Sequence, residues 1–299
     1  MNKKSTRLLA VFTVVFLLLY CSTVEDSLSQ SNKSFLWKVQ SKTNTVYVLG
    51  SIHYLKKEMY PLDDKIEKAF KEADVLAVEA DVTNVEKVDV QKLFGGAFYP
   101  ENDTLEKHLS PKTYALLKKK LSELGASLEA ANKYKPWFLA ISLVSLEISK
   151  LGFDPNYGID RYFLSKASEA KKILELESLE YQFHLSSSLS EKDQELFLVY
   201  TLKDIKVLEK ELDRLVKAWR TGDEGGVESI ITKTVKEDKR LVPIYEIFIY
   251  QRNRNMASKI EDYLKAKETY FVIVGAGHLV GRQGIIQILK SKGFTVEQL

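Results

Sequence analysis

The chain has 299 residues, of which 45% are hydrophobic, and a formal net charge of +3. This amount of apolar sequence is enough to build one large domain or two small ones. The excess charge comes entirely from Lys3, Lys4 and Arg7, so the rest of the chain is neutral overall. That balance argues against a nucleic-acid-binding protein, whose affinity would depend on an excess of basic side chains.

The N-terminus has the pattern of an export signal. The basic residues precede an uncharged apolar run that ends at Cys21, the only cysteine of the chain. Such a run is shorter than the roughly 20 residues that span a bilayer, and it is typical of a signal peptide. Leu18 fits a bacterial lipobox, whereas Tyr20 departs from the small residue usual before a lipidated cysteine. We predict a lipoprotein signal over 1–21 with lipidation at Cys21; an uncleaved anchor or an ordinary secretory signal stays an alternative.

A serine-rich stretch over 22–34 predicts a flexible tether, and a single domain is expected over 35–299. The protein would then lie outside the cytoplasm of a bacterium, held to a membrane by its lipid. The domain opens with an expected edge strand or hairpin partner at 35–39, which pairs with a strand at 46–49.

Strands and helices then alternate in a way that predicts an α/β fold. Asp63 is expected to cap a helix that leads to a buried strand over 74–81, which implies a right-handed crossover. Two later strands are expected at 172–177 and 270–275. The expected helices cover 111–124, 136–151, a segment from Asp160, 190–219, a stretch through 252–254, and 279–290. A mostly parallel central sheet, flanked by helices and interrupted by a large helical insertion, is therefore predicted.

Two strand ends carry the same short motif. Gly50-Ser-Ile-His53 and Gly275-Ala-Gly-His278 each follow a run of β-favouring apolar residues. Open α/β sheets bind their ligands at the C-terminal edge of the parallel strands. Two of the four histidines of the chain are therefore expected at one binding edge.

Glutamates close the two other predicted parallel strands, at Glu79 and Glu177. Two imidazoles and one carboxylate form a common set of ligands for a catalytic divalent metal, with water in the open position. A second carboxylate would serve as general base or would orient an imidazole. For each glutamate alone, a helix cap or a surface acid is the alternative. The sequence predicts a divalent metal site, with zinc, manganese or cobalt as the candidate ions.

These segments resemble the TraB/GumN family, which includes the Tiki-type membrane-anchored metalloproteases. The further landmarks of the resemblance are Pro61-Leu62, Val78-Glu79-Ala-Asp81, Pro136-Trp137, Gly158-Ile-Asp160, Leu176-Glu177, Trp219 with Gly222-Asp223, and Arg252-Asn253. The resemblance implies a fold related to erythromycin esterases and to haem-binding ChaN-type lipoproteins. It also matches His53, Glu79 and His278 to the metal-site residues of the family.

Other polar residues have two interpretations each. Arg252 would bind a substrate carboxylate or stabilise an oxyanion, or else form surface salt bridges. Asp160 would support a metal ligand from the second shell, or cap its own helix. We expect His108 to be solvated and His184 to pack in a loop. Among the tyrosines near the first motif, one would be able to ligate haem iron; these are Tyr47, Tyr54 and Tyr60.

The leading functional hypothesis is a metal-dependent hydrolase that acts on peptide or amide bonds. His53, Glu79 and His278 would hold the metal, Glu177 would accept a proton, and Arg252 would face the oxyanion. One alternative is a non-catalytic lipoprotein that binds haem, metal or a peptide signal. Another is an esterase of the erythromycin type.

Overall fold

The computed structural model describes residues 33–83, 94–167, 171–205 and 207–299. The predicted signal peptide with Cys21 and nearly all of the predicted tether lie outside these residues. Among the helices that are described, none combines the length and the apolar character that crossing a membrane would require.

The described residues form a six-stranded sheet in the order β4-β3-β5-β2-β1-β6. The strands are β1 (Leu36–Gln40), β2 (Thr45–Ser51), β3 (Val75–Val78), β4 (Lys172–Glu175), β5 (Tyr270–Gly275) and β6 (Thr295–Gln298). Four strands, β4, β3, β5 and β2, run parallel, whereas β1 is antiparallel to both β2 and β6. The sheet is thus mixed, and the predicted parallel arrangement describes the part that carries the candidate site.

The first strand has a neighbour on each side. β1 and β2 form the predicted hairpin, in which the Ser41 N–H donates to the Asn44 carbonyl oxygen across the turn. The expectation that β1 lies at the edge is wrong, because β6 pairs with its outer side in a register that places Val39 opposite Val296. β6 is short and only partly buried, which left it without a clear pattern in the sequence.

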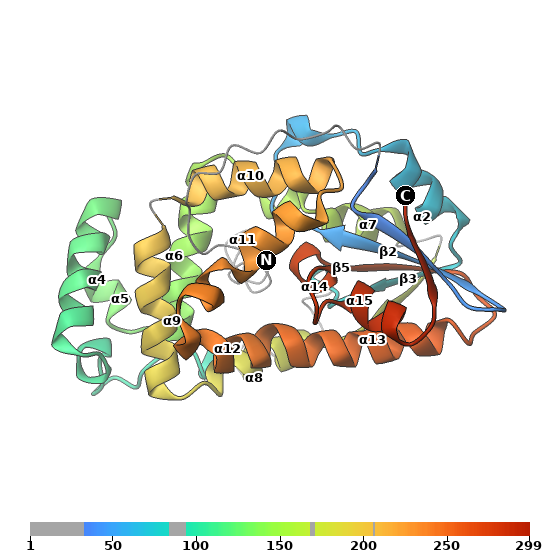
Figure 1. The fold of residues 1–299 in the computed structure, drawn as a ribbon. Helices are drawn as coiled ribbons and strands as arrows, with labels where there is room; N and C mark the ends of the chain where they lie inside the picture. The colour runs from blue at the N-terminus through green and yellow to red at the C-terminus, as the bar shows by residue number, and fades with distance from the viewer. Residues whose placement is uncertain (1–32, 84–93, 168–170, 206) are drawn as a thin grey trace.

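Helices cover both faces of the sheet and also extend beyond one end of it. They are α2 (Asp64–Glu72), α4 (Pro111–Leu124), α5 (Leu128–Ala131), α6 (Pro136–Lys150), α7 (Ile159–Ala167), α8 (Leu179–Ser187), α9 (Glu191–Asp204), α10 (Leu208–Arg220), α11 (Glu224–Glu237), α12 (Val242–Tyr245), α13 (Gln251–Tyr263), α14 (Ala276–Leu279) and α15 (Ile285–Ser291). Figure 1 shows α2 and α7 on one face and α13 with α15 on the other, while α4, α6 and α9 lie beyond the sheet.

An aromatic cluster fixes α2 and α7 to the centre of the sheet. Phe70 of α2 and Phe163 of α7 both contact Phe271 of β5, with ring centroids 5.5 and 5.1 Å away, and lie 4.8 Å from each other. Burying a phenylalanine side chain stabilises a fold by about 1.5–3 kcal/mol. α2 connects β2 to β3 as predicted and is capped by the Asp63 side chain, although β5 lies between these two strands.

Three predicted helical stretches differ in detail. The single helix expected over 190–219 is two helices, α9 and α10; Ser190 caps α9 by accepting from the Asp193 N–H. The stretch expected over 279–290 is divided between α14 and α15. The stretch expected through 252–254 is α13, and the separate helices α11 and α12 precede it; Gly225 and Gly226 lie inside α11, which Asp223 caps at the Gly226 N–H. A π-helical turn, Glu246–Tyr250, precedes α13.

Candidate active site

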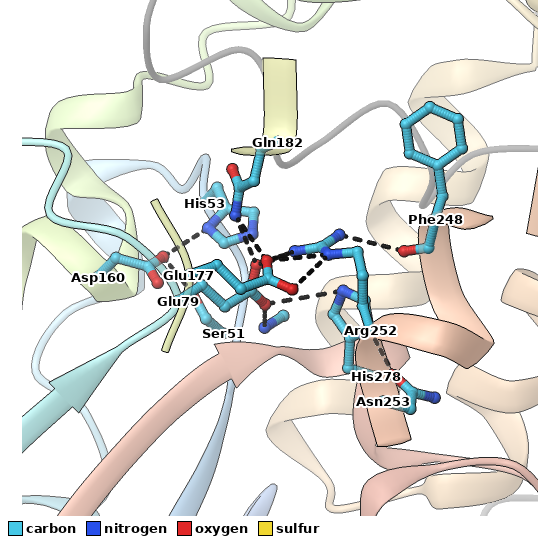
Figure 2. A network of polar contacts seen from close by, with 11 residues as sticks. Ser51, His53, Glu79, Asp160, Glu177, Gln182, Phe248, Arg252, Asn253 and His278 are labelled. Carbon is cyan, nitrogen blue, oxygen red and sulfur yellow. Dashed lines mark hydrogen bonds and ion pairs between the residues drawn. The ribbon is translucent and has the colours of Figure 1, made fainter. Parts of the chain in front are cut away.

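The four parallel strands bring the predicted site residues to one edge of the sheet. Glu79 directly follows β3, and the Glu177 N–H donates to the Glu79 carbonyl oxygen at 2.7 Å, which extends the β3–β4 ladder to both glutamates. His53 lies two residues beyond β2, and His278 lies in α14, directly after the neighbouring strand β5. Figure 2 shows the four side chains in one cluster, as the sequence predicted.

His53 is held from behind by an aspartate. Its Nδ1 lies 2.5 Å from Asp160 Oδ2, and the Ser51 hydroxyl donates to the same oxygen. The other ring nitrogen, Nε2, is buried and has no hydrogen-bond partner among the described residues. Of the two interpretations of Asp160, the structure supports the one in which its carboxylate orients a site histidine.

A glycine allows Asp160 to come this close. A Cβ atom on Gly158 would lie 2.2 Å from the His53 carbonyl oxygen, which is far inside van der Waals contact. The next residue, Ile159, donates its N–H to the Ile52 carbonyl oxygen at 3.1 Å. The start of α7 therefore lies directly against the end of β2, and this places Asp160 behind the imidazole.

Glu79 lies between the two histidines. Its Oε1 accepts from the Gly275 N–H and lies 3.8 Å from His278 Nε2. A Cβ atom built on Gly275 would lie 3.3 Å from Glu79 Oε1, 3.4 Å from His53 Nε2 and 3.5 Å from His278 Cδ2. The three predicted metal ligands therefore surround one point, and glycine at 275 leaves that point free.

Arg252 joins the two glutamates. Its Nη2 donates to Glu79 Oε2 at 2.8 Å and to Glu177 Oε2 at 2.7 Å, and its Nε donates to both Glu177 oxygens. The remaining nitrogen, Nη1, donates to the Phe248 carbonyl oxygen at 3.1 Å. Since Arg252 is only 6% exposed, the alternative of surface salt bridges is wrong. The buried guanidinium thus binds two carboxylates through several hydrogen bonds and offsets part of their charge.

These contacts set the charges of the cluster. Burial and then the Arg252 guanidinium lower the pKa of His278 to about 3, so that this ring is neutral at pH 7. Burial opposes the charge of Glu79, but His278 and Arg252 hold its pKa below the usual value. Burial would likewise lower the pKa of His53, but the Asp160 carboxylate overrides it and raises that pKa. The Glu79 carboxylate is thus ionised at pH 7, and His278 offers an uncharged nitrogen.

A model of the TraB/PrgY/gumN family matches residues 35–298, which is nearly the whole described fold. The chain belongs to this family.

Two groups of relatives are similar to this TraB/PrgY/gumN protein. The protein YbaP of Escherichia coli is 28% identical over 82% of this chain and 87% of its own length, and its activity is not characterised. Metalloprotease TIKI1 of Xenopus tropicalis is 23% identical over 90% of this chain and 62% of its own length. A metalloprotease TIKI homolog of Nematostella vectensis is 26% identical over 91% and 69%. No solved structure matches the chain.

Two site residues of this TraB/PrgY/gumN protein were not assigned a role from sequence. Gln182 of α8 donates from Nε2 to Glu177 at 3.2 Å and to Glu79 at 3.4 Å. Asn253 of α13 faces His278, with Oδ1 2.6 Å from Nδ1. Gln182 comes from α8 and Asn253 from α13, so the sequence patterns that identify the strand ends give no signal for either residue. For Asn253, its place directly after Arg252 is the one local indication.

The other predicted candidates have partners elsewhere. His108 does not simply face solvent: its two ring nitrogens face Asp103 and Glu191, and the ring stacks on Tyr99. His184 is exposed on α8, so the expectation of packing in a loop is wrong. The three tyrosine hydroxyls bond to Glu72, Ser145 and the Tyr157 carbonyl oxygen; they belong to Tyr47, Tyr54 and Tyr60, respectively.

The donor set fits a divalent cation in type and in charge. The cluster contains three carboxylates, those of Glu79, Glu177 and Asp160, against one guanidinium, that of Arg252. The buried, unpartnered Nε2 of His53 points at the same spot as Glu79 Oε1. Across the described residues, however, no three His, Cys, Asp or Glu side chains are already arranged at metal-binding distances. Binding would therefore draw the ligands together by small side-chain movements.

Proposed function

We propose that this TraB/PrgY/gumN protein is a metal-dependent hydrolase of peptide or amide bonds. The observation that carries the proposal is the convergence of His53 Nε2, Glu79 Oε1 and the His278 ring around the point left free by Gly275. Two imidazoles and a carboxylate are a frequent catalytic set for zinc, and they also suit manganese or cobalt. The relatives named metalloprotease TIKI support the same reaction class.

In this proposal the polar residues of the cluster divide the work of the reaction. When bound, the ion would lower the pKa of a water from 15.7 toward about 7 and polarise the scissile carbonyl. Asp160 orients His53 through Nδ1, and Arg252 keeps Glu79 ionised. Glu177 would accept the proton of the attacking water, and Arg252 would face the oxyanion. Both of these roles require the hydrogen bonds from Arg252 Nη2 and Nε to Glu177 to open when substrate binds.

The pairing of Glu177 with Arg252 also favours a second candidate function. Since Glu177 and Arg252 satisfy each other, neither is free to act on a substrate in the described arrangement. A protein that only captures haem, a metal or a peptide signal needs no free base. An esterase of the erythromycin type is a further candidate; it would use the same hydrolase site on an ester substrate. We also propose that the fold is related to that of erythromycin esterases and ChaN-type lipoproteins.

One purified preparation distinguishes these functions. We would measure its metal content by mass spectrometry and its haem absorption, and then screen a peptide library with and without a chelator. The hydrolase predicts about one divalent ion per chain and cleavage that stops with the chelator and returns with the metal. Haem absorption, or bound metal without any cleavage of peptides or esters, would favour the binding protein. Cleavage that is insensitive to the chelator would contradict the metal-dependent reaction.

We also propose that the protein is lipid-anchored outside the cytoplasm through Cys21, the single cysteine at the end of the apolar run. Cys21→Ala should leave an unprocessed precursor or release the protein from membranes. Ser29→Ala in the predicted tether is the control and should change nothing. A mature N-terminus found elsewhere, without lipid, would contradict the anchor.

A further inference from the structure

The amide of Asn253 is fixed at both ends. Its Nδ2 donates to the Gln283 carbonyl oxygen at 2.7 Å, and only the nitrogen of an amide is able to donate to a carbonyl. The amide oxygen is therefore turned the other way, toward His278 Nδ1 at 2.6 Å. Asn253 is 1% exposed, so the orientation is held inside the protein.

This orientation of the amide determines which ring nitrogen of His278 carries the hydrogen. An amide oxygen accepts but cannot donate, so a hydrogen bond from His278 requires a hydrogen on Nδ1. In a neutral ring the lone pair then belongs to Nε2, which is the nitrogen on the side of Glu79 Oε1. A histidine side chain free in water favours the opposite tautomer, with the hydrogen on Nε2. The protein thus imposes the less common form, and only that form presents a ligating nitrogen to the site.

The first turn of α13 positions Asn253 beside His278. Arg252 and Asn253 are consecutive in the first turn of α13, and both are buried. Arg252 bonds to Glu79, and Asn253 bonds to His278, so one turn of helix supports two of the three predicted ligands. Figure 2 shows both side chains reaching the cluster from the same helix. The π-helical turn Glu246–Tyr250 lies directly before them, and such turns are frequent at functional sites.

We infer that Asn253 is a positioning residue that locks His278 in the Nδ1–H tautomer and thereby presents Nε2 as a metal-ligating nitrogen. Its neutral amide does for His278 what the Asp160 carboxylate does for His53, without adding another charge to a cluster that already contains three carboxylates. The part of this inference that concerns metal rests on the proposed function. The tautomer does not.

The tautomer is directly measurable in the full-length protein without any substrate. We would label histidine with ¹⁵N and record long-range ¹H–¹⁵N correlations, which distinguish a protonated from an unprotonated ring nitrogen. The four histidines give few signals, and His278→Gln assigns the one of interest. The wild type should show a protonated Nδ1 and a bare Nε2 at His278. A His278 signal with the hydrogen on Nε2 would overturn the inference, whatever the Asn253 variants show.

Three variants test whether Asn253 is the cause. Asn253→Ala removes the acceptor, so the His278 signal should shift toward the Nε2–H form. Asn253→Asp keeps an acceptor at Nδ1 and should retain the wild-type tautomer, even though it loses the donation to Gln283. Asn255→Ala, on an exposed position of the same helix, is the matched control. An unchanged tautomer in Asn253→Ala would show that Asn253 does not set it.

A Zn²⁺ titration by calorimetry gives the second readout. Loss of a residue that orients a metal ligand typically weakens metal affinity by about 10–100-fold, which is the loss expected for Asn253→Ala. Asn253→Asp should bind more tightly than Asn253→Ala, and Asn255→Ala should match the wild type. If wild type with the expected tautomer binds no Zn²⁺, Mn²⁺ or Co²⁺, the metal proposal fails while the tautomer assignment stands. If the Asn253→Ala variant binds Zn²⁺ as tightly as the wild type does, the positioning role fails while the metal proposal stands.

Discussion

His53 Nδ1 and Asp160 Oδ2 lie 2.5 Å apart, although 107 residues separate them in the chain. The contact joins the end of β2 to the first turn of α7, and the Ser51 hydroxyl donates to the same carboxylate oxygen. Because Nδ1 faces the carboxylate, the site-facing nitrogen of His53 is Nε2. In both Gly-x-x-His motifs, Nδ1 of the histidine thus faces a side chain from a helix, which leaves Nε2 as the nitrogen on the side of the site.

The first prediction concerns the three ligands. His53→Ala and His278→Ala should each remove most of the bound metal and nearly all hydrolase activity. The double variant should lose little more, because residues that act as one unit are strongly non-additive. Glu79→Gln should behave like them, since an amide is a poor ligand for a divalent cation. Metal stoichiometry and cleavage rates on the same preparations would check this.

The exposed His184 provides the matched control for these variants, because His184→Ala removes an imidazole outside the cluster. It should retain full metal and activity. Thermal melts should show that all variants still fold, with melting temperatures lowered where a buried hydrogen bond is lost. Full metal occupancy in the variant that lacks both His53 and His278 would contradict the proposed ligands.

The second prediction separates chemistry from folding in the Glu177–Arg252 pair. Glu177→Gln should keep the metal and slow cleavage by about 10²–10⁴-fold, the usual contribution of general acid–base help. Arg252→Leu should instead destabilise the fold by about 3–5 kcal/mol, because it leaves two buried carboxylates without their partner. Denaturant unfolding measures the second effect, with the exposed Arg254→Leu of the same helix as control. Equal stability of Arg252→Leu and wild type would refute the buried network.

The strand ends of the site were predictable, because a buried parallel strand leaves a strong local pattern. Apolar runs that end in Gly-x-x-His or in glutamate identify His53, Glu79, Glu177 and His278, and the parallel pairing brings them together. The supporting residues were harder to find. Gln182 points at the glutamates only because of how α8 packs, and nothing in its local sequence indicates that packing.

The errors in the fold have a similar physical origin. The helical pattern continues from α9 into α10 with no proline or glycine between them, so only tertiary packing separates the two helices at Ile205 and Val207. β6 alternates between exposed and half-buried residues over four positions, which is too short a pattern to identify. Without a recognisable β6, the sequence pattern predicts β1 at the edge of the sheet, although β6 pairs with its outer side.

The third prediction tests the close approach of α7 to β2. Gly158→Ala would place a methyl group against the His53 carbonyl oxygen, which is backbone and has little freedom to move. Crowding of this kind costs about 1–3 kcal/mol, so the melting temperature should fall, and activity should fall with it as Asp160 withdraws from His53. Gly95→Ala is the control, because its Cβ would have no neighbour within 4 Å. It should leave stability unchanged or raise it slightly. Equal melting temperatures for Gly158→Ala and wild type would contradict the described contact.

The last prediction concerns a buried acid far from the metal ligands. Asp204, at the end of α9, is 5% exposed, and its Oδ2 has no hydrogen-bond partner among the described residues. Burial, followed by the nearby Glu237 and Glu211, raises the pKa of Asp204 to about 7, against a partial offset from Lys203. In the unfolded chain the same carboxyl titrates near pH 4.

The sign of the pH dependence follows from these two pKa values. Below about pH 4 the carboxyl is protonated in both states, so it imposes no penalty. Between about pH 4 and 7 the unfolded chain releases the proton and the folded protein retains it, so stability falls by up to about 1.4 kcal/mol per pH unit. Above pH 7 the whole penalty is present. Asp204→Asn should therefore be more stable than wild type at pH 8, by a margin that shrinks toward pH 4. Urea unfolding at several pH values would measure this, with the exposed Asp213→Asn as control; a margin that stays constant with pH would refute the raised pKa.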